Sequence, residues 1–133
     1  AVSGDLMIRG TEAAAWSRGS PRSLDKGLRF YAVVPQPTYL ALVEVQNANA
    51  VVLHPAAGSQ WRVEAGTHLL QPPAASPDYV ARVGGRARYV LVGSVSSLSV
   101  PSGGVITSAS ALVSGNPGSR VLGEVEVAWQ APR

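Results

Sequence analysis

The sequence predicts an all-β protein: a sandwich or barrel of about eight to ten short antiparallel strands, with one short helix near residues 105–114. Short apolar segments alternate with turn residues every eight to twelve positions, which is typical of such folds. The densest apolar alternation lies in residues 27–54, which we interpret as three strands joined by two turns. The rest of the chain is expected to cover the faces of this stretch and to pair with its edges.

Length and composition indicate one globular domain, residues 1–133. The chain is 46% hydrophobic and 14% charged, whereas disordered segments combine low hydrophobicity with high charge. The net charge is +3, but the basic residues are scattered, and only Arg86 and Arg88 lie within two positions of each other. Nucleic-acid-binding proteins concentrate such residues on one face, so we expect no nucleic-acid partner.

The chain contains no cysteine, which excludes disulfides and thiolate metal sites and leaves the redox compartment open. No apolar run approaches the roughly 20 residues of a membrane helix, so no membrane-spanning segment is expected. The first ten residues lack the basic and then apolar pattern of a signal peptide. Whether a signal, an anchor or another domain precedes Ala1 stays open.

The first 26 residues are expected to form strands and a loop. Asp5–Arg9 is a short strand candidate closed by a glycine. Glu12–Arg18 is interpreted as a strand, although its alanines favour a helix. Residues 19–26 combine glycine, proline, serine and aspartate, which is typical of a loop.

The central stretch supplies the three most regular strands. Leu28–Val34 alternates apolar and polar positions with a period of two, which predicts a half-buried strand that ends at two prolines. Thr38–Gln46 is apolar on both faces in its first half, which predicts a central strand covered on both sides there. Residues 47–49 form a turn in which asparagine tolerates the left-handed conformation, and Ala50–His54 returns as the third strand.

Short strands and loops are expected to follow. Gln60–Val63 and Thr67–Gln71 are short strand candidates, and the three prolines of residues 72–78 predict an extended loop. Tyr79–Val83 and Arg86–Ser94 are predicted to form a hairpin through two glycines.

The last forty or so residues begin with a serine-rich loop, 94–104. In Val105–Ser114 apolar residues recur at helical spacing, which predicts the one short helix, with Gly115 as its C-cap. Val121–Trp129 alternates valine with glutamate and is expected to form the closing strand.

Candidate catalytic and metal-binding groups lack the spacing that their chemistry requires. His54 and His68 are the only histidines, whereas zinc needs three or four ligands. The serines have no G-x-S-x-G elbow, and the glycines form no phosphate-binding motif. Glu124 and Glu126 share a strand face, which indicates a solvated face rather than an acid/base pair. We therefore expect no catalytic residue, no metal and no cofactor.

The tryptophans and tyrosines offer two interpretations. They could form an exposed platform that stacks on sugar rings, or each could seal an edge of the core, which their large surface favours. Binding sites lie more often on loops than on the scaffold that supports them. The candidate ligand- or partner-binding residues are Trp61, Arg62, Tyr79, Arg86 and Arg88.

Five segments together resemble the bacterial domain-of-unknown-function family 4384. The recurring theme of that family is a strand with r-f-x-v, a strand with y-l-x-l-x-x-v, a strand ending in l-x-P, a hairpin from a-G to l-P, and a late l-l-v-s strand. The similar segments here are Leu28–Val34, Tyr39–Val45, Val51–Pro55, Ala65–Pro72 and Tyr89–Ser94. The resemblance covers roughly residues 27–129, and residues 1–26 precede this family-like core.

The resemblance implies an immunoglobulin-like sandwich that serves as a sensory, binding or accessory module. Such domains are often attached to anti-sigma-factor-like, protease-like, caspase-like and kinase-like proteins. The family has no established catalytic residues, so none is carried over. We expect a non-enzymatic module of a periplasmic or cell-surface protein that binds another protein. The alternatives are a module that binds a carbohydrate or small ligand through exposed aromatics, and a hydrolase with a dispersed site. The identity of the partner and the oligomeric state stay open.

Overall fold

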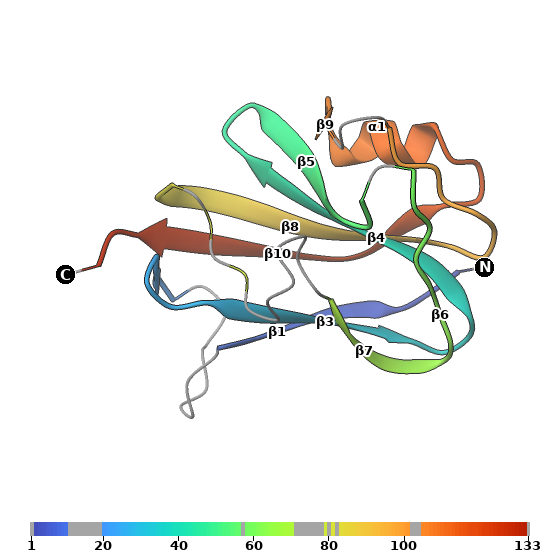
Figure 1. The fold of residues 1–133 in the computed structure, drawn as a ribbon, viewed down its shortest axis with the longest axis horizontal. Coiled ribbons are helices and arrows are strands. Elements are labelled where there is room, and N and C mark those ends of the chain that lie inside the picture. The colour runs from blue at the N-terminus through green and yellow to red at the C-terminus, as the bar shows by residue number, and fades with distance from the viewer. Residues whose placement is uncertain are drawn as a thin grey trace.

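The computed structural model describes residues 2–10, 20–56, 58–70, 79, 81, 83–101 and 105–132. This part of the chain contains ten strands and one helix, and it forms three layers (Figure 1). A small sheet lies at the bottom of the view, a larger sheet in the middle, and the helix α1 (Ala109–Ser114) at the top. The prediction of an all-β, sandwich-like protein with one short helix is confirmed at this level.

The small sheet has three antiparallel strands in the order β1–β3–β7. They are β1 (Asp5–Gly10), β3 (Leu28–Val34) and β7 (Gly66–Leu70). Along β3 buried residues alternate strictly with half-buried ones, as its sequence predicts. The buried set packs against the larger sheet.

The larger sheet runs in the order β2–β10–β8–β4–β5–β9, and β6 pairs with β4 beside this path. Neighbouring strands are antiparallel except β10 and β2, which are parallel. The strands are β2 (Arg22–Ser23), β4 (Thr38–Gln46), β5 (Asn49–His54), β6 (Arg62–Val63), β8 (Gly85–Ser94), β9 (Val105–Ile106) and β10 (Arg120–Gln130). At the β4–β5 turn Asn47 has φ +57°, the left-handed conformation expected of asparagine.

The central strand β4 serves two hydrophobic cores. Its Leu40 and Leu42 belong to the inter-sheet core, which we define as the buried cluster between the two sheets. Its Ala41 and Val43 belong to the outer core, the buried cluster between the larger sheet and the α1 layer. The prediction that the first half of this strand is covered on both sides is confirmed.

The outer core depends on short side chains. The fully buried residues that the sheet contributes to it are all alanines and valines. The helix has only six residues, too few to be stable in isolation, so packing must hold it. Its first turn is capped by Ser108, whose Oγ accepts a hydrogen bond from the Ala111 N–H at 3.1 Å. Leu98 and Val100 complete this layer from the segment that follows β8.

The predicted helix over residues 105–114 is too long at its start. Val105–Ile106 forms the edge strand β9, which pairs with Ala50 and Val51 of β5. The helix begins only after its cap at Ser108, because Val105 and Ile106 pair with the edge of the larger sheet. Its C-terminal end agrees with the prediction, since the Gly115 N–H bonds to the Ala111 carbonyl.

The predicted hairpin between Tyr79–Val83 and Arg86–Ser94 is wrong. Both edges of β8 are occupied, one by β4 and the other by β10, so no edge remains for a partner from residues 79–83. Tyr79 pairs instead with Leu28 of the small sheet, through backbone hydrogen bonds of 2.8 Å in both directions.

One further segment differs from the sequence prediction, and two predicted segments lie where the structure gives no description. The loop predicted for residues 19–26 contains the two-residue strand β2. The strand predicted for Glu12–Arg18 and the extended loop predicted for residues 72–78 lie outside the described residues.

The two sheets are in close contact where β1 passes β10. A Cβ atom on Gly123 would lie 2.8 Å from the Leu6 backbone nitrogen and 2.9 Å from the Leu6 Cβ. The register of β10 also shifts between Val121 and Gly123, at the same place. Glycine at position 123 is therefore required by the contact between the sheets.

We predict that Gly123→Ala destabilises the fold by about 1–3 kcal/mol, because overpacking forces the backbone of β1 away. The matched control is Gly84→Ala, whose added Cβ would meet its nearest atom at an ordinary 3.4 Å. Urea unfolding of the two variants measures the difference. Equal midpoints would show that the sheets do not touch at Gly123.

Candidate functional site

The five predicted binding residues do not meet in one place. Arg62 pairs with Tyr39, and Tyr39 faces Ser94 at the end of β8. Arg86 and Arg88 lie six to eight positions earlier on β8, roughly 20–27 Å away at the rise of a strand. A single site cannot contain both groups.

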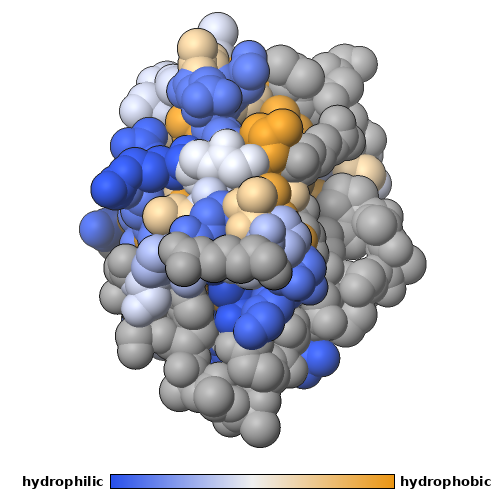
Figure 2. Space-filling view, turned by 90° about the vertical axis from the view of Figure 1, so that its left-hand side faces the viewer, coloured by the Kyte–Doolittle hydropathy of each residue, from blue (hydrophilic) through white to orange (hydrophobic). Residues whose placement is uncertain are grey.

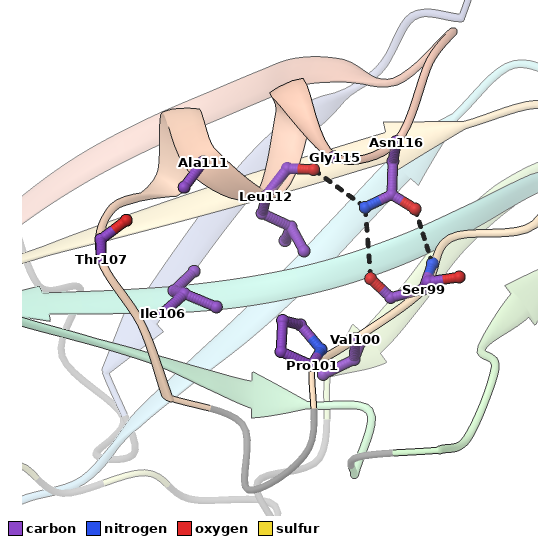
Figure 3. Close-up of a pocket in the computed structure, with 9 residues that line it drawn as sticks. All are labelled: Ser99, Val100, Pro101, Ile106, Thr107, Ala111, Leu112, Gly115 and Asn116. Atoms are coloured by element: carbon purple, nitrogen blue, oxygen red, sulfur yellow. Dashed lines mark hydrogen bonds between the residues drawn. The ribbon is translucent and has the colours of Figure 1, made fainter.

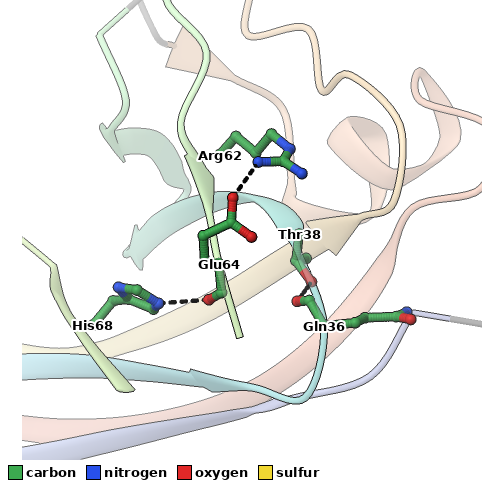
Figure 4. Close-up of polar contacts among 5 residues, drawn as sticks. All are labelled: Gln36, Thr38, Arg62, Glu64 and His68. Carbon is green, nitrogen blue, oxygen red and sulfur yellow. Dashed lines mark hydrogen bonds and ion pairs between the residues drawn. The ribbon is translucent and has the colours of Figure 1, made fainter. Parts of the chain in front are cut away.

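Trp61 and Arg62 contact neighbouring side chains around β6. The Trp61 ring stands edge-on to the His54 ring, with 4.4 Å between centroids, and packs against the inter-sheet core. The Arg62 guanidinium pairs with the Glu64 carboxylate at 2.7 Å, and the Glu64 carbonyl oxygen lies 2.6 Å from the His68 Nε2 (Figure 4). The ion pair is largely exposed, and such pairs contribute little to stability.

Arg86 and Arg88 form ion pairs with two carboxylates of β10. Arg86 Nη1 lies 2.5 Å from Glu126 Oε1, and Arg88 Nε lies 3.1 Å from Glu124 Oε1. All four side chains are about half exposed or more. This arrangement agrees with the interpretation of Glu124 and Glu126 as a solvated face.

Tyr79 belongs to a hydrogen-bonded cluster at the end of the inter-sheet core. The hydroxyls of Tyr79 and Tyr89 both donate to Oε2 of Glu44, the latter at 2.8 Å. The Trp129 Nε1–H donates to the Tyr89 hydroxyl at 2.9 Å. Tyr89 and Trp129 are buried, so these aromatics seal the core, the interpretation favoured by the sequence, and do not form an exposed sugar platform.

Tyr89 stays protonated because its surroundings disfavour the phenolate. Burial raises the pKa of Tyr89 far above its usual value of about 10, and the nearby Tyr79 and Glu44 raise this pKa further. Tyr89 is therefore a neutral donor to Glu44, and the negative charge of the cluster belongs to the carboxylate.

The sequence reasoning missed Glu44. The only feature of the sequence that could have identified Glu44 is its position on the strand. With a period of two, Glu44 follows Leu40 and Leu42 on the face that points to the inter-sheet core. A carboxylate at an inward position must find hydrogen-bond donors, and the two tyrosines supply them. The donors come from segments 35 and 45 residues away, so no local pattern could name them.

An apolar groove of about 440 Å³ opens on the helix side of the larger sheet (Figure 3). Three segments line it: residues 99–101, residues 106–107 and the helix with its C-terminal turn. Their lining residues are Ser99, Val100, Pro101, Ile106, Thr107, Ala111, Leu112, Gly115 and Asn116. We call this hollow the helix groove.

The buried side chain of Asn116 holds the helix groove in shape. Its Oδ1 accepts from the Ser99 N–H at 2.7 Å, and its Nδ2 donates to the carbonyls of Ser99 at 3.2 Å and Leu112 at 2.9 Å (Figure 3). These bonds tie the end of α1 to the opposite wall. The groove is thus preformed, because one side chain fixes both of its walls.

A smaller cleft of about 220 Å³ lies at the end of the larger sheet that carries the β4–β5 turn. It is lined by Glu44, Gln46, Asn47, Asn49, Val51 and Val83. Figure 2 views the molecule from this end, where hydrophilic residues make up much of the described surface and a small hydrophobic cluster interrupts them. We call this hollow the Glu44 cleft.

Comparisons with known proteins give no relative. No family model, no curated protein and no solved structure matches the chain. The resemblance to domain family 4384 therefore stays a prediction.

The part of the chain that the structure describes holds no group of three or more histidine, cysteine, aspartate or glutamate residues placed to bind a metal ion. No helix among these residues has the length and apolarity needed to cross a membrane.

We predict that Tyr89→Phe lowers the free energy of unfolding at pH 7 by about 1–3 kcal/mol, since the buried Trp129 N–H loses its acceptor and Glu44 loses a donor. Tyr31→Phe is the matched control, because Tyr31 is only half-buried and lies on the face of β3 that is turned away from the inter-sheet core. We expect this control to change the free energy of unfolding by no more than about 0.5 kcal/mol. Urea unfolding measures both variants.

A comparison of wild type with Tyr89→Phe at several pH values tests the ionisation of Tyr89. The unfolded chain releases this proton above pH 10 while the folded protein retains it, so wild-type stability falls by about 1.4 kcal/mol per pH unit from this group alone. The variant lacks the group, so the stability gap between wild type and Tyr89→Phe should narrow above pH 10. A gap that stays constant up to pH 11 would contradict the raised pKa of Tyr89.

Proposed function

We propose that the chain is a non-catalytic accessory module of a bacterial envelope or signalling protein, and that it binds another protein. The observation that supports this proposal most directly is the helix groove. It is apolar, open on the outer face of the larger sheet, and fixed by Asn116. A preformed hollow loses little conformational entropy on binding, which favours recognition.

The apolar lining of the groove favours apolar side chains of a protein as its occupant. Val100, Pro101, Ile106 and Leu112 supply apolar walls around a volume of about 440 Å³. Burying one such side chain yields about 1.5–3 kcal/mol, whereas micromolar affinity requires about 8 kcal/mol. The remainder must come from surface outside the groove, which a macromolecular partner covers.

The immunoglobulin-like topology and the periplasmic or cell-surface location belong to the same proposal. They are supported by the resemblance of residues 27–129 to domain family 4384 and by the two-sheet arrangement. A carbohydrate-binding module that uses exposed aromatics has less support, because Tyr89 and Trp129 are buried and Tyr79 is bonded to Glu44.

We predict that a photo-crosslinking residue at Ala111, which lines the helix groove, gives a discrete product with one envelope protein. The same residue at Ser114, exposed on the same helix outside the groove, should give none. Ala111→Arg should reduce capture of that protein at least tenfold by filling the groove, and Ser114→Arg should leave capture unchanged. Thermal unfolding confirms that both variants are folded.

Equal crosslinking from the two positions would argue against the groove as the binding surface. No discrete product from either position would argue against a protein partner altogether.

A further inference from the structure

Glu44 carries a half-buried negative charge that no described cation balances. Both of its hydrogen bonds, from Tyr79 and Tyr89, end on Oε2. Within the described ranges, the ion pairs join Arg62, Arg86 and Arg88 to other carboxylates, and none involves Glu44. Partial removal of a carboxylate from water is costly unless the charge is paired, so the site favours a cation from outside.

The two phenols orient the carboxylate and leave its charge in place. Tyr89 remains a neutral donor because burial raises its pKa. Oε1 of Glu44 receives no hydrogen bond from the described part of the chain. One oxygen of the carboxylate is therefore held by the protein, and the second is left for a ligand.

The Glu44 cleft has a matching chemical lining. The amide side chains of Gln46, Asn47 and Asn49 carry carbonyl oxygens that accept N–H bonds. The Gln46 Nε2 donates to the Val83 carbonyl at 3.1 Å, which leaves its oxygen as the remaining polar atom of that amide. Val51 and Val83 supply apolar wall for methylene groups.

We propose that the Glu44 cleft binds an ammonium or guanidinium group, whose charge pairs with Glu44, whose N–H groups bond to the surrounding amides and whose methylenes lie against Val51 and Val83. The volume of about 220 Å³ equals roughly seven water molecules at their share of liquid volume, enough for such a head group and part of its stem. A calcium ion fits less well, since it takes six to eight oxygen ligands and the cleft offers a single carboxylate.

The ligand could be a free polyamine or a lysine or arginine side chain of a protein. Its site is separate from the helix groove, so the inference does not rest on the proposed protein partner. The two sources share one chemistry, and the experiment below separates them.

A ¹H–¹⁵N NMR titration tests this site. The probes are spermidine, the capped dipeptide acetyl-Gly-Arg-amide, and the neutral acetyl-Gly-Gln-amide. We expect at least one cationic probe to shift the side-chain amide signals of Gln46, Asn47 and Asn49, and the neutral dipeptide to leave them in place. Binding of spermidine alone identifies a free amine as the ligand, and binding of the arginine dipeptide identifies a side chain of a partner.

Two variants, each of which converts one glutamate to glutamine, show whether binding depends on the charge of Glu44. Glu44→Gln should weaken binding at least tenfold while it keeps acceptors for both tyrosines. Glu124→Gln, on the exposed outer face, should leave the dissociation constant within twofold. If Glu44→Gln does not fold, Asn49→Tyr at the exposed rim of the cleft keeps Glu44 and should abolish binding by filling the space.

Three results would overturn the inference. They are an absence of shifts with every cationic probe, equal binding of the neutral dipeptide, and unchanged binding by Glu44→Gln or, in its place, by Asn49→Tyr. Ca²⁺ is titrated in parallel, and shifts produced by Ca²⁺ but by neither organic cation would replace the proposed ligand class with a metal ion.

Discussion

The fold depends on the fact that β4 is apolar on both of its faces. Leu40 and Leu42 point to one side of the larger sheet and Ala41 and Val43 to the other, so water must be excluded from both sides. The small sheet covers one face and the α1 layer covers the other (Figure 1). Among the described residues, both covering layers bury their apolar clusters against the larger sheet, which makes this sheet their common support.

The strands in which apolar and polar residues alternate regularly could be predicted from the sequence, because this alternation reflects which face of each strand is buried. β3, β4 and β10 agree closely with their predicted ranges. The pairing of strands was less predictable, since β8 pairs with β4 and β10 and not with the preceding residues 79–83. That choice depends on which apolar faces meet across the sheet, a property of the assembled fold. The two-residue strands β2 and β9 are too short to leave a pattern.

The candidate sites were less predictable than the fold, because each joins distant segments. The sequence predicts Arg86 and Arg88 as partner-binding charges, but in the structure both form ion pairs with glutamates on the neighbouring strand. Tyr79 was identified as a binding residue, but its hydroxyl turns inward to Glu44. The helix groove could not be foreseen, since Ser99, Ile106 and Asn116 meet only when α1 packs on the sheet.

The central claim is that β4 joins both cores into one cooperative unit, and native-state hydrogen exchange tests it most directly. Val43→Ala alters only the outer core and should cost about 0.5–3 kcal/mol. If the claim holds, the amides of Phe30 and Ala32 in the small sheet lose protection by the same free energy as those of β4. If these small-sheet amides keep their wild-type protection while β4 and β8 lose theirs, the layers unfold independently and the claim is contradicted.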